Sequence, residues 1–140
     1  MSFLLDTCAI SELVKQRPDP GVIRWLDQVE ERRLYVSVLT LGELAKGVAK
    51  LPETPRRNAL REWLEHDLVE RFAGRILPVD DAVALAWGRL QGEAERTGEK
   101  VPVIDSLLAA TAECHALTVV TRNIADFRKC GANTCNPWEA

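Results

Sequence analysis

The stretch "VIDSLLAATAECHALTVVTR" (103–122) decides the fold class, because it joins a helical segment to a strand-like one without a linker. Residues 103–116 are rich in leucine and alanine and largely apolar, which predicts a helix in the centre of the molecule. Residues 117–122 combine valine, threonine and leucine, a composition that favours a β-strand. Helical and strand-like segments that follow one another in this way are typical of an α/β fold.

The same alternation extends toward the N-terminus. Three more strands are predicted, at "SFLLD" (2–6), "RLYVSV" (33–38) and "GRILPVD" (74–80). Helices are predicted over about 8–16, from Val22 to Val29, over 40–51, along Leu60, Leu64 and Leu68, and along Val83, Trp87, Leu90 and Ala94. Strands that alternate with helices form βαβ units, so we expect one domain over 1–140 with a parallel sheet covered on both faces. The strand order does not follow from this pattern.

Length and composition are those of an ordinary globular protein. The chain has 140 residues, of which 46% are hydrophobic and 28% charged, with a net charge of −3. This charge argues against a general nucleic-acid coat but leaves room for a local basic patch. No apolar stretch approaches the roughly 18 residues of a membrane span, and no secretory signal precedes the first strand. We therefore expect a cytoplasmic protein with no membrane partner.

The cysteines are not spaced as zinc ligands. No CxxC pair occurs among Cys8, Cys114, Cys130 and Cys135, and the two histidines do not complete such a site. Cys8 follows Asp6 by two positions, and two residues of helix rotate the side-chain direction by about 200°. We therefore expect Cys8 to point away from Asp6, into the packing between helix and sheet.

Acidic and amide side chains occur where the predicted strands end. Asp6 closes the first strand, Glu43 lies in the first turn of the helix after the second, and Asn123 and Asp126 follow the last. The carboxyl ends of parallel strands share one edge of the sheet, where ligands bind. Asp105 opens its helix, and it joins the others only if that helix begins at the same edge.

Helix capping is the alternative explanation for most of these residues. Thr40 and Glu43 have the spacing of a capping box, Asn123 and Asp126 have similar spacing, and Asp105 suits the first turn of a helix. A cap contributes only ~1 kcal/mol, whereas carboxylates crowded in one cleft repel one another unless a cation neutralises them. An oxygen-rich cluster without histidine suits Mg²⁺ or Mn²⁺, so we expect Mg²⁺ (or Mn²⁺) as the cofactor.

Four segments resemble, in order, the motifs of PIN-domain ribonucleases. They are "LLDTCAISEL", "SVLTLGELAKGV", "VIDSLLAATAECHALTVVTRNIADF" and the terminal "NPWEA". The likeness is greatest to the toxins of VapBC-type toxin–antitoxin modules, including the FitB-like branch, and it covers nearly the whole chain. It implies a three-layer α/β/α fold around a parallel sheet and a metal-dependent endoribonuclease that cuts RNA. It also implies a homodimer, silenced in a larger hetero-oligomer by a cognate VapB/FitA-like antitoxin.

The resemblance also assigns site residues. The first three acids of the family fall on Asp6, Glu43 and Asp105, which would be both catalytic residues and metal ligands. The fourth catalytic acid falls on Asp126, with the place of Asn123 as the alternative.

Hydroxyl side chains and two departures complete this comparison. Thr7 and Thr121 match hydroxyl positions that support such sites, and Asn123 is a further supporting residue. The chain departs from the family pattern at Cys8, where an asparagine is usual, and at Asn123, which replaces a charge with an amide in one branch. These departures leave open whether one or two metal ions bind.

Basic residues near the acids would guide an RNA substrate. Lys46 and Lys50 share a helical side with Glu43, and Arg122 and Arg128 flank the last acidic turn. An ordinary solvated surface is the alternative explanation for these residues.

Two other function classes compete with the nuclease. A catalytically inactive PIN-like module would bind RNA or a protein without cutting it, and the loss of a core acid would favour it; none is lost. A phosphatase-like or response-regulator-like enzyme would want a lysine after a late strand, where "LTVVTR" supplies an arginine.

Overall fold

The computed structural model describes residues 1–139, so Ala140 of the terminal "NPWEA" segment lies outside the described residues. Five strands form one sheet in the order β3-β2-β1-β4-β5, and every neighbouring pair is parallel. The strands are β1 (Phe3–Leu5), β2 (Leu34–Ser37), β3 (Ile76–Leu77), β4 (Thr118–Val120) and β5 (Thr134–Cys135). The predicted α/β fold with a parallel sheet is confirmed. The sequence pattern predicted the first four strands and missed β5.

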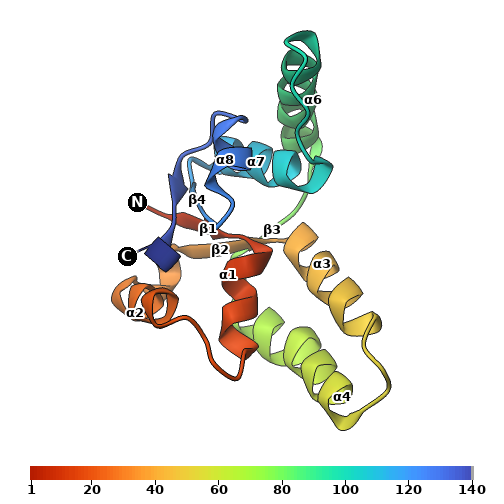
Figure 1. The fold of residues 1–140 in the computed structure, drawn as a ribbon. Coiled ribbons are helices and arrows are strands. Elements are labelled where there is room, and N and C mark those ends of the chain that lie inside the picture. Colours follow the sequence, from red (N-terminus) through yellow and green to blue (C-terminus); the bar gives the residue numbers. More distant parts are fainter. Residues whose placement is uncertain (140) are drawn as a thin grey trace.

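Helices cover both faces of this sheet (Figure 1). In that view α1, α2, α3 and α4 lie below the sheet, and α6, α7 and α8 lie above it, which gives the three layers. The α-helices are α1 (Thr7–Ser11), α2 (Pro20–Gln28), α3 (Val38–Ala49), α4 (Pro55–Glu62), α5 (Val69–Arg71), α6 (Asp81–Arg96), α7 (Val103–His115) and α8 (Ile124–Arg128). Shorter 3₁₀ turns are η1 (Glu12–Val14), η2 (Glu31–Arg33) and η4 (Pro137–Glu139), and η3 (Trp63–Leu68) is a π-helical segment between α4 and α5.

Two hydrophobic cores lie on the two faces of the sheet. Successive side chains of a strand point to opposite faces, and both faces are buried here. Accordingly Leu5 and Val120 belong to the core that also contains residues of α1 and η3, while Leu4 and Val119 belong to the core beneath α7 and α8. All four side chains are buried. This two-sided burial explains why the strands are continuous apolar runs in the sequence.

The start of α3 differs from the prediction. Ser37 is the N-cap, and its hydroxyl accepts a hydrogen bond from the Leu39 amide at 3.0 Å. Thr40 is already the third residue of the helix, so the predicted capping box of Thr40 and Glu43 is wrong. Glu43 lies in the second turn rather than the first, and capping does not explain it.

The order of the strands places the ends of β1 and β4 at a topological switch point. From β1 the chain moves to β2 and β3 on one side, whereas β4 and β5 extend the sheet on the other. Ligands of open α/β sheets bind where the order reverses in this way. Asp6 directly follows β1 and Thr121 directly follows β4, and the Asp6 amide donates to the Val120 carbonyl at 3.1 Å.

No helix within residues 1–139 has the length and apolar composition that crossing a membrane requires.

Candidate active site

Asp6 occupies the switch point and is almost completely buried, with 4% of its surface exposed. It is the N-cap of α1, and its Oδ1 accepts a hydrogen bond from the Ala9 amide at 2.9 Å. Burial raises the pKa of Asp6 above its usual value, although hydrogen bonds from the Thr121 hydroxyl and the α1 backbone oppose this shift. The nearby charge of Glu43 raises the pKa further. Asp6 therefore caps a helix and also faces a second carboxylate.

Glu43 lies near Asp6, although it belongs to α3, the helix that follows β2. The Thr7 hydroxyl, in the first turn of α1, donates a short hydrogen bond to Glu43 Oε1. This bond joins two residues that lie 36 positions apart in the chain. This hydrogen bond links the carboxylate of α3 to the first turn of α1, directly after β1.

Asp105 also belongs to this group of acids. It lies in the first turn of α7 and is half-buried. Burial raises the pKa of its carboxyl group, and the charges of Asp126, Asp6 and Glu43 raise it further. The structure therefore brings the start of α7 to the edge that holds the other acids, which the sequence pattern left open.

Asp126 and Asn123 occupy different places after β4. Asp126 is half-buried in α8, and its charge acts on Asp105. Asn123 is exposed at the N-cap position of α8, but its side chain makes no capping hydrogen bond. The backbone N–H of Asn123 instead donates a hydrogen bond to Thr121 Oγ1 at 2.9 Å. The buried Thr121 hydroxyl thereby connects this turn to Asp6. We call Asp6, Glu43, Asp105 and Asp126 the acidic cluster.

The acidic cluster has the donor chemistry of a hard divalent cation, although the acids do not form a closed ligand shell. Within residues 1–139, no three His, Cys, Asp or Glu side chains already converge on one metal position. In the same residues, no Lys or Arg forms a salt bridge with any of the four carboxylates. The negative charge is therefore uncompensated, and oxygen donors without histidine suit Mg²⁺ or Mn²⁺.

Cys8 does not lie where the sequence predicts. It is half-buried and belongs to neither core, in contrast to Cys130 and Cys135, which pack against them. Burial raises the pKa of its thiol, the charge of Asp6 raises it further, and Arg122 lowers it. Cys8 therefore borders the acidic cluster, and the expectation that it belongs to the packing between helix and sheet is wrong.

A buried acid outside this cluster was missed by the sequence reasoning. Glu12 is 2% exposed and accepts hydrogen bonds from Lys15 Nζ at 2.7 Å and from Trp138 Nε1 at 3.2 Å. Burial raises its pKa, but these hydrogen bonds and one from the Asp19 amide outweigh burial, so the pKa of Glu12 is lowered. A single acid in a helical stretch carries no local signal for such a role, because its partner Trp138 is 126 positions away.

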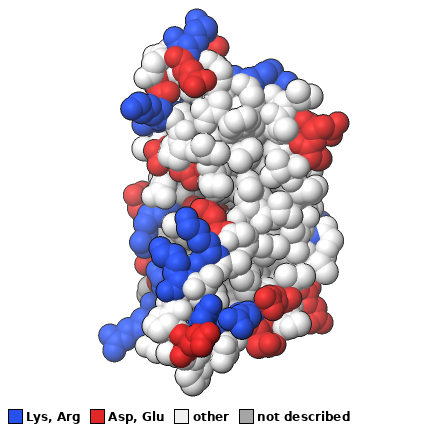
Figure 2. Space-filling view, turned by 90° about the vertical axis from the view of Figure 1, so that its right-hand side faces the viewer, with Lys and Arg blue, Asp and Glu red and all other residues white. Residues whose placement is uncertain are grey.

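Surface charge is unevenly distributed. Figure 2 shows Lys and Arg gathered in a patch at mid-height on the left, with acidic atoms at its edge, while much of the right-hand surface is uncharged. The net charge of −3 thus conceals a local basic surface, as the sequence analysis allowed.

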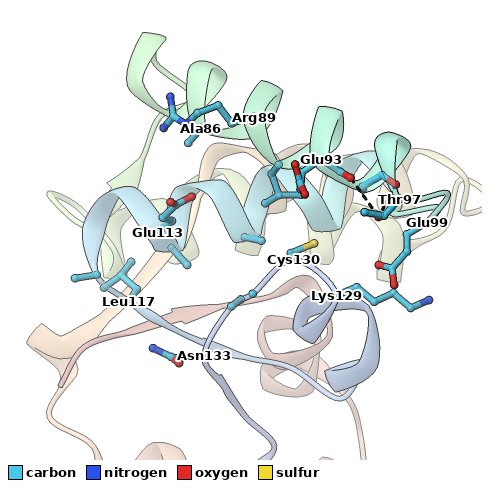
Figure 3. A pocket seen from close by; sticks show the side chains of 17 residues that line it. Ala86, Arg89, Glu93, Thr97, Glu99, Glu113, Leu117, Lys129, Cys130 and Asn133 are labelled. Carbon is cyan, nitrogen blue, oxygen red and sulfur yellow. Dashed lines mark hydrogen bonds between the residues drawn. The ribbon is translucent and has the colours of Figure 1, made fainter.

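One cavity lies apart from the acidic cluster. It has a volume of about 700 Å³ and lies between α6, α7 and the segment after α8 (Figure 3). None of the four clustered acids lines it. Cys130 lines it, and burial together with the charges of Asp105, Asp126 and Glu99 raises the pKa of this thiol to about 11. We therefore assign the candidate active site to the acidic cluster and not to the cavity.

Comparison with known proteins shows the family to which the chain belongs. The sequence matches the PIN domain over residues 3–132, and the chain belongs to the PIN-domain family. It is 39% identical over 135 residues to the toxin FitB of Neisseria gonorrhoeae, covering 96% of this chain and 97% of that protein. It is 37% identical over 136 residues to the VapC ribonuclease Y4jK of Sinorhizobium fredii, covering 97% of both chains.

A solved structure gives the same result. The chain superposes on the crystal structure of FitAcB from Neisseria gonorrhoeae with a TM-score of 0.93 and 38% identity, over 99% of each chain. The predicted resemblance to VapC and FitB toxins of the PIN-domain family is thereby confirmed.

Proposed function

We propose that this chain is the toxin of a toxin–antitoxin module and that it acts as a Mg²⁺- or Mn²⁺-dependent endoribonuclease. The observation that carries the proposal is the acidic cluster. Its four carboxylates come from separate elements and influence one another, and no Lys or Arg within residues 1–139 forms a salt bridge with them. Relatives named as a toxin and as a ribonuclease support it. All three core acids are retained, so no observation favours the inactive binding module.

In this proposal Asp6, Glu43 and Asp105 hold the cation. When bound, it would act as a Lewis acid, lower the pKa of a bound water molecule and neutralise charge on the scissile phosphate. The chain itself orients the ligands. The α1 backbone and Thr121 fix Asp6, and Thr7 fixes Glu43.

Asp126 is proposed as the fourth catalytic acid. Its charge acts on Asp105, so it strengthens the negative field into which a cation is drawn. Asn123 is exposed beside it, where its amide can contact substrate without adding charge. Whether one or two cations bind depends on this pair, since fewer carboxylates hold a second ion less well.

The partner we propose is a VapB/FitA-like antitoxin, bound to a homodimer of this chain in the cytoplasm. Uncompensated carboxylates are a receptor for a guanidinium group, which pairs with them bidentately. We therefore expect an arginine from the C-terminal tail of the antitoxin to enter the acidic cluster. Expression of the chain alone should arrest growth, and co-expression of the adjacent reading frame should relieve the arrest.

The enzymatic proposal is tested with partner-free protein and total RNA. Cleavage should require Mg²⁺ or Mn²⁺ and stop in EDTA, and it should be abolished in Asp6→Asn. Glu113→Gln is the matched control, because Glu113 is an acid of α7 that lines the separate cavity. Cleavage that persists at the wild-type rate in folded Asp6→Asn protein would refute the proposal.

A further inference from the structure

The C-terminal residues Asn136–Trp138, here called the NPW turn, are fixed against the first part of the chain. The Trp138 indole donates to Glu12 Oε2 at 3.2 Å, and Glu12 is buried and also held by Lys15. Asn136 Oδ1 accepts from the Trp138 amide at 3.0 Å, which closes the turn. The indole is therefore anchored at its polar edge, and its ring face is left for another contact.

The NPW turn packs against α2 at a position that requires a glycine. A Cβ atom on Gly21 would lie 2.6 Å from the Pro137 carbonyl oxygen, which is too close for any other residue without movement. On the other side, the Thr121 amide donates to the Cys135 carbonyl at 3.0 Å. The turn is thus positioned by α2 and by the end of β4, the strand end at which Thr121 contacts Asp6.

The guanidinium of Arg122 lies over the free face of Trp138. The distance from Arg122 Cζ to the ring centroid is 4.9 Å. A stacked guanidinium is attracted by the face of the ring while its N–H donors in the plane stay available. Arg122 is exposed, and no carboxylate within residues 1–139 forms a salt bridge with it.

Arg122 also lies at the border of the acidic cluster. It stands between Thr121, which contacts Asp6, and Asn123. Its positive charge lowers the pKa of the Cys8 thiol, which the charges of Asp6, Asp105 and Glu43 raise. A free guanidinium beside a cation-binding acidic site is suited to a phosphate group of the same substrate.

We propose that Arg122 binds a phosphate of the RNA substrate next to the scissile position, and that Trp138 is a positioning residue that holds the guanidinium there. This inference rests on the proposed nuclease function and adds a substrate contact to it. A merely structural role for Trp138 would act through its hydrogen bond to Glu12 and its packing against the hydrophobic core. A positioning role acts through the ring face.

Two pairs of variants separate these roles. Arg122→Ala should raise KM for a defined single-stranded RNA at least about tenfold, as expected for a lost charge-assisted hydrogen bond, with kcat little changed. Arg122→Lys should recover part of this loss. Trp138→Phe keeps a ring face and loses the indole N–H, so its KM should stay near the wild-type value, whereas Trp138→Leu should resemble Arg122→Ala.

Salt dependence and a binding assay complete the test. RNA binding is measured by the anisotropy of labelled RNA, in EDTA so that no cleavage occurs. The slope of log affinity against log salt concentration should be smaller in magnitude by about 0.7 in Arg122→Ala than in the wild type, because one phosphate contact on a single strand contributes this value. Arg71→Ala is the matched control, because Arg71 stacks on Phe72 at 5.6 Å in another part of the molecule. Its KM and salt slope should equal those of the wild type.

The outcomes are distinguishable. If the wild-type protein binds RNA with a larger salt slope than Arg122→Ala but never cleaves it, the nuclease proposal fails and the phosphate contact stands. If Arg122→Ala binds with an unchanged slope and an unchanged KM, the inference is overturned. If Trp138→Phe and Trp138→Leu lose stability alike and neither changes KM, Trp138 is structural and does not position Arg122.

Discussion

Two buried acids on the same segment of chain have opposite environments. Asp6 and Glu12 lie six residues apart, and only 4% and 2% of their surfaces are exposed. Burial and the charge of Glu43 raise the pKa of Asp6. At Glu12 burial acts in the same direction, but Lys15, the Asp19 amide and Trp138 outweigh it and lower the pKa.

The difference separates the acid that we propose to be functional from a structural one. Glu12 is fully partnered inside the protein and anchors the C-terminal NPW turn. Asp6 has hydrogen bonds and faces a second carboxylate, but no Lys or Arg within residues 1–139 forms a salt bridge with it. We propose that its charge is left for a ligand from outside. Burial alone does not mark the site; uncompensated like charge does.

The largest expected effect comes from removing one charge of the acidic cluster. Asp105→Asn should lower kcat/KM for RNA cleavage by about a hundredfold or more, because a cation ligand is lost while the side-chain volume is kept. Glu12→Gln, at the structural acid, should leave kcat/KM within about threefold once the protein is folded, since the hydrogen-bond partners of Glu12 are Lys15, Asp19 and Trp138. Equal losses of kcat/KM in Asp105→Asn and Glu12→Gln would show that the acidic cluster has no special role in cleavage.

Stability should respond in the opposite sense. In metal-free buffer at pH 7, Glu12→Gln should reduce the free energy of unfolding by about 2 kcal/mol, the scale of lost hydrogen bonds to a charged group. Asp105→Asn should instead increase it, because the variant removes repulsion among the four acids. Urea unfolding measures both, and a loss of stability in Asp105→Asn would contradict the description of the cluster.

The pH dependence sharpens this contrast. An acid with a raised pKa binds more protons in the native state than in the unfolded chain, so its contribution to stability falls as pH rises from its ordinary value of 3.8. The advantage of Asp105→Asn over wild type should therefore grow between about pH 4 and pH 7 in EDTA.

Glu12 should behave in reverse. Its pKa is lowered from 4.5, so its stabilisation is present above that pH and is lost as pH falls toward the native pKa. The deficit of Glu12→Gln should shrink below pH 4.5, and thermal melts of the three proteins across this range check both signs.

Among the residues that border the acidic cluster, the smallest effect on cleavage is expected at Cys8. Cys8→Ala should keep metal-dependent cleavage within about tenfold of wild type, because no thiol donor is required by an oxygen-rich site. This test is stricter than the sequence analysis suggested, because Cys8 lies near the acids instead of pointing away from them. Abolished cleavage in a well-folded Cys8→Ala protein would show that the Cys8 side chain is part of the active site.

Much of the fold follows from local pattern. Apolar runs such as those at Leu4 and Leu5 or Val119 and Val120 identify strands because both faces of the sheet are buried. The two-residue strand β5 has no such run and exists only through its pairing with β4. The helix start at Ser37 was missed because Thr40 and Glu43 offered an equally good local cap.

The candidate site was predictable in part for the same reason. The ends of the predicted strands placed Asp6, Glu43 and the turn of Asn123 and Asp126 at one edge, and the family resemblance added Asp105. The convergence of Asp105 with the others depends on how α7 crosses the sheet, which is a tertiary property. The link from Glu12 to Trp138 and from Trp138 to Arg122 joins distant parts of the chain, and no local period encodes it.

The proposed function requires that the acidic cluster is a receptor for a divalent cation. The most direct measurement is thermal unfolding of metal-free protein during titration with Mn²⁺ or Mg²⁺, with Asp105→Asn and Glu12→Gln in parallel. A bound cation stabilises the native state by about 2.7 kcal/mol at a hundred times its Kd. We predict this stabilisation in wild type and in Glu12→Gln and its loss in Asp105→Asn. Equal stabilisation of all three proteins, or of none, would contradict the claim.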